Sequence, residues 1–174
     1  AESKKSPSEN VILKGTNEDS FQLEAMFKTA DKYDDFNWSE STKDIAEQIL
    51  DFYPHNVKAL ELLVKSNLSE KLYSEANMAI DKIEKLASSD SLGYSHYFKK
   101  GRILHGLKEY DLAVSSFNKA IAIDQKKDFA YYKRGLVEFE RENYHIAIED
   151  FTAANQLDSD YYDFKKHIVL ALIK

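Results

Sequence analysis

Residues 143–158 read NYHIAIEDFTAANQLD, and residues 109–124 read EYDLAVSSFNKAIAID. The two stretches share a Tyr, two Ala, a Phe and an Asp in the same order. Tyr110 corresponds to Tyr144 and Phe117 to Phe151, which is a constant offset of 34 residues. A fixed period of this length is the signature of a protein built from repeated structural units.

Each unit has the pattern of two helices joined by a short turn. The apolar residues of the second half recur at spacings of three and four, which places them on one face of a helix: Tyr144, Ala147, Ile148, Phe151, Ala154 and Leu157. The first half carries apolar residues around the small Gly135, and the polar link 141–143 is short. The small residues predict close approach of two antiparallel helices. One such pair cannot bury its apolar face alone, but a stack of pairs can.

The order aromatic, Gly, Tyr, Ala, Phe, Ala with this period resembles the tetratricopeptide repeat (TPR) family. The resemblance is closest for the two copies that contain Gly101 and Gly135. It implies an all-α fold, a right-handed α-solenoid of antiparallel helix pairs, which is a TPR-like superhelix. In a third copy Val64 replaces the glycine, and we expect a wider spacing between its two helices.

The domain organisation follows from the repeat register. We expect a disordered N-terminal tail at 1–19, because this stretch is polar, and a TPR-like domain at 20–174. Within the domain, the expected units are a divergent repeat at about 23–56, three clearer repeats at 57–93, 94–127 and 128–161, and a capping helix or the first half of a further repeat at 162–174.

Composition argues against several functional classes. The 174 residues have a net charge of −6 and include no cysteine, which excludes disulfides and thiol chemistry. No phosphate-binding loop or catalytic motif is present, and the five histidines are scattered. We therefore expect no catalytic residues, no metal site, no cofactor and no enzyme activity. The basic excess is too small to predict a nucleic-acid partner.

The compartment stays open at this stage. The sequence has no run of 18 apolar residues, so no membrane-spanning helix is expected. It begins with Ala rather than Met and has a polar start. These features fit a cytoplasmic protein and equally an exported or periplasmic protein whose signal was removed. Contact with a membrane is expected only if the chain is tethered through its N-terminus.

A groove along the first helices of the pairs is the expected binding site. In a stack of helix pairs these helices line the concave surface, and Lys99 and Lys133 occupy equivalent positions 34 residues apart. The same surface is expected to include His105 and Glu140. The predicted peptide-binding residues are Lys65, Phe98, Lys99, Arg102, Phe129, Tyr132 and Lys133. Basic and aromatic side chains together favour a protein or peptide partner with acidic and hydrophobic residues.

Three functional hypotheses follow. The first is a non-catalytic protein–protein interaction module, an adaptor, scaffold or co-chaperone-like protein that binds a peptide segment. The second is an accessory domain of a larger enzyme whose catalytic part lies outside this segment. The third is a self-assembling scaffold, a homo-oligomer formed through the C-terminal helix with Ile168 and Leu172 as contact residues.

Overall fold

The computed structural model describes residues 17–35, 39–88, 91–160 and 162–174. The regular elements in these ranges are all α-helices: α1 (Asn17–Asp35), α2 (Ser39–Phe52), α3 (Val57–Ser69), α4 (Tyr73–Leu86), α5 (Tyr94–Gly106), α6 (Tyr110–Ile123), α7 (Asp128–Glu140), α8 (Tyr144–Leu157) and α9 (Tyr162–Leu172). None of the helices in the described part of the chain is long and apolar enough to cross a membrane.

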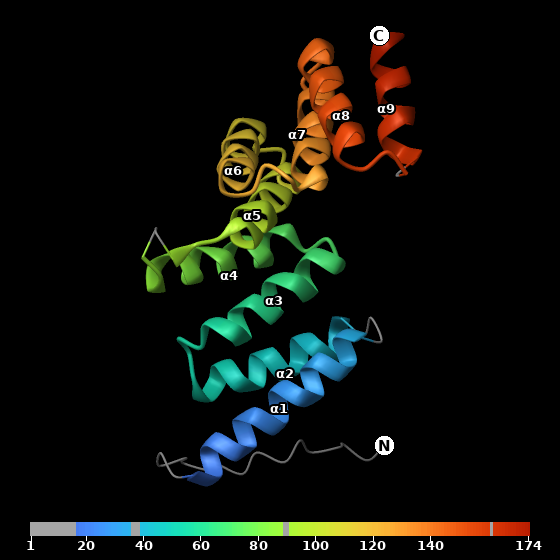
Figure 1. Ribbon diagram of the computed structural model, residues 1–174. Helices are drawn as coiled ribbons and strands as arrows, with labels where there is room; N and C mark the ends of the chain where they lie inside the picture. Colours follow the sequence, from blue (N-terminus) through green and yellow to red (C-terminus); the bar gives the residue numbers. More distant parts are fainter. Residues whose placement is uncertain (1–16, 36–38, 89–90, 161) are drawn as a thin grey trace, which may run out of the picture.

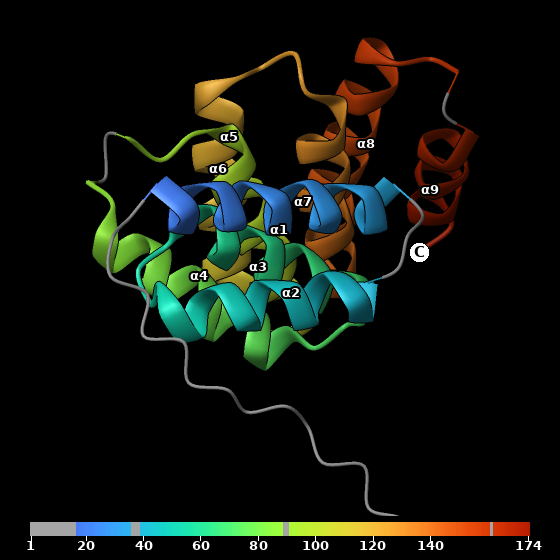
Figure 2. The same ribbon diagram turned by 90° about the horizontal axis from the view of Figure 1, so that it is seen from below.

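Successive helices pack as antiparallel pairs that stack along one direction, with α1 at one end and α9 at the other (Figure 1). Seen from the α1 end, the pairs lie behind one another and turn progressively (Figure 2). The expected all-α solenoid is confirmed. Each helix contacts mainly its neighbours in sequence, as the repeat pattern predicted.

The N-terminal boundary differs from the expected one. Helix α1 begins at Asn17, so residues 17–19, which we assigned to the tail, are helical. An Asn followed by Glu18 and Asp19 favours a helix start, because negative charge is stabilised at the helix N-terminus. The rest of the predicted tail, 1–16, lies outside the described residues.

The turn inside each clear repeat has one conformation. Lys71, Lys108 and Glu142 each have positive φ, at 60°, 63° and 64°. The residue after each of them donates its backbone N–H to a carbonyl five residues earlier: Leu72 to Asn67 at 2.8 Å, Glu109 to Leu104 at 2.8 Å and Asn143 to Glu138 at 2.9 Å. This pattern ends the first helix and reverses the chain within three residues.

Small residues bring the two helices of a pair together. A Cβ built on Gly101 would lie 2.7 Å from the ring of Phe117, and one built on Gly135 would lie 2.8 Å from the ring of Phe151. In the pair α3–α4 the glycine is replaced by Val64, and the position of the Phe is taken by Ile80. Val64 and Ile80 are both about 1% exposed in one core cluster. A smaller partner thus compensates for the larger Val.

Polar side chains connect successive pairs. Arg134 of α7 donates to both carboxylate oxygens of Asp150 in α8, at 2.9 and 2.5 Å, and also to Asn118 in α6. Hydrogen bonding to Asp150 raises the pKa of Arg134, although burial opposes the rise. Because Asp150 is only 3% exposed, this charge pair fixes the relative position of three helices.

Candidate basic groove

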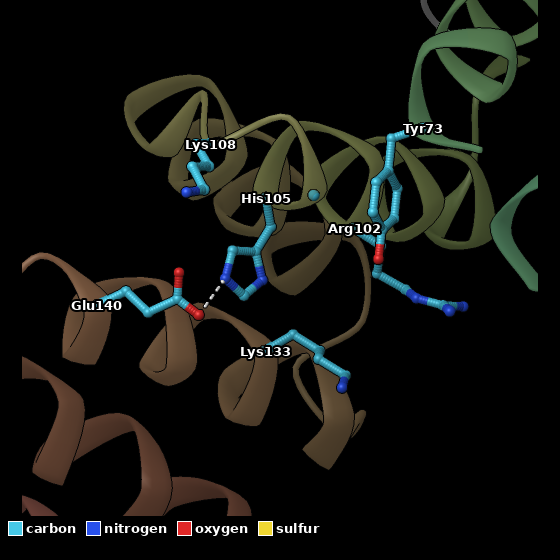
Figure 3. A pocket seen from close by; sticks show the side chains of 7 residues that line it. Tyr73, Arg102, His105, Lys108, Lys133 and Glu140 are labelled. Atoms are coloured by element: carbon cyan, nitrogen blue, oxygen red, sulfur yellow. Dashed lines mark ion pairs between the residues drawn. The ribbon is translucent and has the colours of Figure 1, made fainter. Parts of the chain in front are cut away.

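One pocket of about 370 Å³ is enclosed by α4, α5, α7 and the turn after α5 (Figure 3). Its lining residues are Tyr73, Arg102, His105, Gly106, Lys108, Lys133 and Glu140. These residues come from successive repeats, so the pocket depends on the stacking of the pairs. We call it the α5–α7 pocket.

One end of the α5–α7 pocket is cationic. The side chains of Arg102 and Lys133 extend toward this end (Figure 3). Arg102 is exposed and makes no ion pair with another residue in the described ranges. Burial and the charge of Arg102 lower the pKa of Lys133, while Asp163 acts in the opposite direction. Two close cations that repel each other are stabilised when an anion lies between them.

The other end holds a neutralised carboxylate. The Oε1 atom of Glu140 lies 3.0 Å from Nε2 of His105, and its Oε2 atom accepts a hydrogen bond of 3.1 Å from the hydroxyl of Tyr110. Partial burial and the bond to Glu140 raise the pKa of Tyr110, so its hydroxyl stays a donor at neutral pH. Glu140 therefore has partners of its own and does not neutralise Arg102.

Tyr73 forms the wall of the pocket because Gly106 gives it room. A Cβ on Gly106 would overlap the ring of Tyr73, the first residue of α4. The tyrosine ring can thus lie flat on the end of α5, with its hydroxyl directed toward Arg102 (Figure 3). Gly106 is the last residue of α5, where the backbone of the next turn begins.

The structure brings together only some of the residues predicted for the site. Arg102 and Lys133 share the α5–α7 pocket. Lys99 lies instead in a separate small depression with Glu61 and His96. Lys65 is exposed on α3 and lines neither cavity.

The aromatic predictions fare differently. Tyr132 is only 5% exposed and does not face a groove, which corrects the prediction. Its ring packs against Phe164 of α9, with ring centroids 4.9 Å apart, so the last helix covers it. Phe98 is half-buried against Phe117, at 5.9 Å between centroids. Phe129 keeps 38% of its surface exposed at the start of α7.

Sequence reasoning missed Tyr73, Gly106 and Lys108. A signal existed for the first two, because the tyrosines at the start of the second helices recur, and Tyr110 contacts Glu140, the counterpart of Gly106. A glycine at that position leaves space for the ring of Tyr73. Lys108 lies in a turn, where helical periodicity carries no information.

Residues 95–127 match the family described as tetratricopeptide repeat. A search of curated protein sequences found no match. Among solved structures, one described as "Crystal structure of MamA protein" has a TM-score of 0.75 at 22% identity, covering 87% of this chain and 81% of that one. "MamA 41-end from Desulfovibrio magneticus RS-1" has a TM-score of 0.77 at 18% identity, covering 87% and 84%.

A third structure is described as "Crystal structure of YrrB: a TPR protein with an unusual peptide-binding site". It has a TM-score of 0.69 at 15% identity and covers 85% of this chain and 75% of that one. At these identities the likeness shows the fold. With the repeat match and the helix pairs described above, the chain is a tetratricopeptide repeat protein.

Proposed function

We propose that this protein is a non-catalytic interaction module, an adaptor or scaffold, that binds a peptide segment of a partner protein along the first helices of its repeats. The peptide places an acidic group in the α5–α7 pocket. One observation carries this proposal: Arg102 and Lys133 converge there, and the nearest carboxylate, Glu140, is already bound by His105 and Tyr110.

Energetics favour an anionic ligand over a neutral one. Lys133 is half-buried and lies beside another cation, which raises the free energy of its charged form. A carboxylate between the two cations relieves this repulsion and makes charge-assisted hydrogen bonds. Phe129, exposed at the start of the same helix, offers an apolar contact for a neighbouring residue of the peptide. YrrB, a protein of this fold that is described as having a peptide-binding site, supports the same type of ligand.

The proposal is tested with a fluorescent library of decapeptides that combine Glu or Asp with Leu, Ile or Phe. Each peptide is paired with a version in which the acidic residues are amides. We expect acidic members to bind and their amide versions to bind at least about tenfold more weakly. Affinity for the acidic members falls as salt is added, because the charges are solvent-accessible.

The decisive variant is Arg102→Glu with Lys133→Glu. It is expected to weaken binding of the acidic peptides by at least about tenfold. The matched control is Lys126→Glu with Lys127→Glu, which makes the same change of charge at exposed positions outside the pocket. Equal affinities for the two double variants, with both proteins folded, would show that the α5–α7 pocket is not the binding site.

A further inference from the structure

Helix α9 has the register of a first helix in a further repeat. An offset of 34 residues places Phe164 at the position of Ala130 and Ala171 at the position of Val137. All four residues are buried, at 3% exposure or less. The face of α9 that packs on the preceding pair is therefore the same face that α7 uses.

The opposite face of α9 is open. Val169 and Leu172 correspond to Gly135 and Glu138 of α7, which are buried beneath α8. In α9 the exposed fractions are 58% for Val169 and 66% for Leu172. Ile173 adds another exposed apolar side chain at 73%. The uncovered surface is thus the place where, in the other repeats, a second helix packs antiparallel to the first.

Charge distinguishes between candidate occupants of this face. Lys165 and Lys166 lie one turn before the apolar residues and are both exposed. Residues 162–174 contain three lysines and one aspartate, although the whole chain has a net charge of −6. Two copies of α9 would bring like charges together, which opposes pairing with a second copy. An acidic helix would meet complementary charge.

Ile168 lies on the inner side of the helix. It packs against the cluster of Tyr132, Phe151 and Phe164, so it is not an outer contact residue. The apolar part of the open face is formed by Val169, Leu172 and Ile173, which we call the α9 face.

We propose that the α9 face docks an amphipathic α-helix of another protein, lying antiparallel to α9 in the place of a second repeat helix. Its apolar residues cover Val169 and Leu172, and Asp or Glu residues near its C-terminal end meet Lys165 and Lys166. Opposite Val169 it carries an aliphatic residue, as Ile80 does opposite Val64. This site is separate from the α5–α7 pocket and does not depend on the function proposed for it.

The chain supplies its own probe. A capped peptide with the sequence of α4, residues 73–86, has the aliphatic pattern that fits a Val-containing first helix. In the test peptide Lys82→Glu and Lys85→Glu place acidic residues in its C-terminal half. The unchanged α4 peptide is the charge control, and a peptide of α6, residues 110–123, is the shape control because it carries Phe117 instead of Ile80.

Titration of the fluorescent peptides into the whole chain gives the affinities. The acidic α4 peptide is expected to bind about fivefold or more tightly than the unchanged one, with the difference shrinking in high salt. Lys165→Glu with Lys166→Glu reverses this preference. Leu172→Asp abolishes binding and, because Leu172 is exposed, leaves the melting temperature nearly unchanged.

Two other results would overturn the proposal. One is no binding of the acidic peptide up to about 1 mM, or binding that Leu172→Asp does not change, since the peptide would then displace α4 elsewhere in the chain. The other is a dimer, measured by light scattering, that Leu172→Asp dissociates; in that case a second copy covers the face. Failure of the pocket variants alone leaves this test unaffected.

Discussion

At the scale of single residues, backbone geometry and close contacts set the repeat. Three turn residues without a glycine adopt positive φ, which costs a non-glycine residue about 1–2 kcal/mol relative to its preferred conformations. At the centre of two pairs, a glycine allows an aromatic ring to approach the helix backbone. These positions make opposite predictions for substitution.

Replacement of the turn residue Glu142 by Gly is expected to stabilise the protein by about 0.5–1 kcal/mol. Gly adopts the observed φ of 64° without steric cost, and this gain exceeds its larger entropy loss on folding. Glu149→Gly in the exposed interior of α8 is the matched control and is expected to destabilise by about 1 kcal/mol. Urea unfolding of the three proteins measures both changes, and a loss of stability in Glu142→Gly would contradict the turn geometry.

Gly135→Ala is expected to destabilise the protein by about 1–3 kcal/mol, because the added methyl group overlaps the ring of Phe151. Gly93→Ala is the control, since a Cβ there meets no atom within 4 Å. Adding Phe151→Ile to Gly135→Ala recreates the Val64–Ile80 type of packing and is expected to recover part of the loss. Thermal unfolding that is the same for both single variants would exclude the close approach of α7 and α8.

At the scale of helices, charged side chains join one pair to the next. Glu84 of α4 lies 2.5 Å from Nζ of Lys100 and 3.0 Å from Nε2 of His96, both on α5. Burial raises the pKa of Glu84, but the hydrogen bonds from Lys100 and His96 outweigh this effect and hold it below its ordinary value of 4.5. The carboxylate therefore stabilises the contact between α4 and α5.

This contact predicts a pH dependence. A carboxyl group with a lowered pKa in the folded state contributes stability that is fully present above its unfolded pKa, near 4.5, and is lost as the pH falls through the folded value. Glu84→Gln is therefore expected to lower the free energy of unfolding by about 1 kcal/mol at pH 7 and to have little effect below about pH 3. Glu75→Gln, at an exposed position of the same helix, is the control. A difference between wild type and Glu84→Gln that persists unchanged at pH 3 would contradict the assignment.

At the scale of the whole molecule, stability depends on contacts between neighbouring helices. Distant helices in the stack have few contacts with each other, so damage at one end should remain local. The last contact is formed by Phe164, which is fully buried and covers Tyr132 and Phe129. The C-terminal helix therefore completes the core of the last pair.

Phe164→Ala is expected to destabilise the C-terminal end by about 3–5 kcal/mol through the cavity that it leaves. Hydrogen exchange followed by mass spectrometry should show loss of protection in α7, α8 and α9. Protection in α3 and α4 should be retained, because these helices do not contact α9. Uniform loss of protection along the chain would show instead that the stack unfolds as one unit.

The sequence by itself determined the repeat architecture of this protein. The constant offset of Gly101, Tyr110 and Phe117 in the next unit fixed the helix pairs, because close packing of antiparallel helices requires small and aromatic residues at defined positions. The same periodicity predicted that Arg102 and Lys133 face the same surface, and the structure places both in one pocket.

Only the tertiary structure decided which side chains remain available to a partner. Periodicity gives the direction of a side chain from its own helix, but burial depends on the neighbouring helix. Tyr132 is covered by Phe164 of α9, and Glu140 is bound by His105 and by Tyr110 of α6. Helix α9 itself keeps Val169 and Leu172 exposed because, among the described residues, no second helix packs on it.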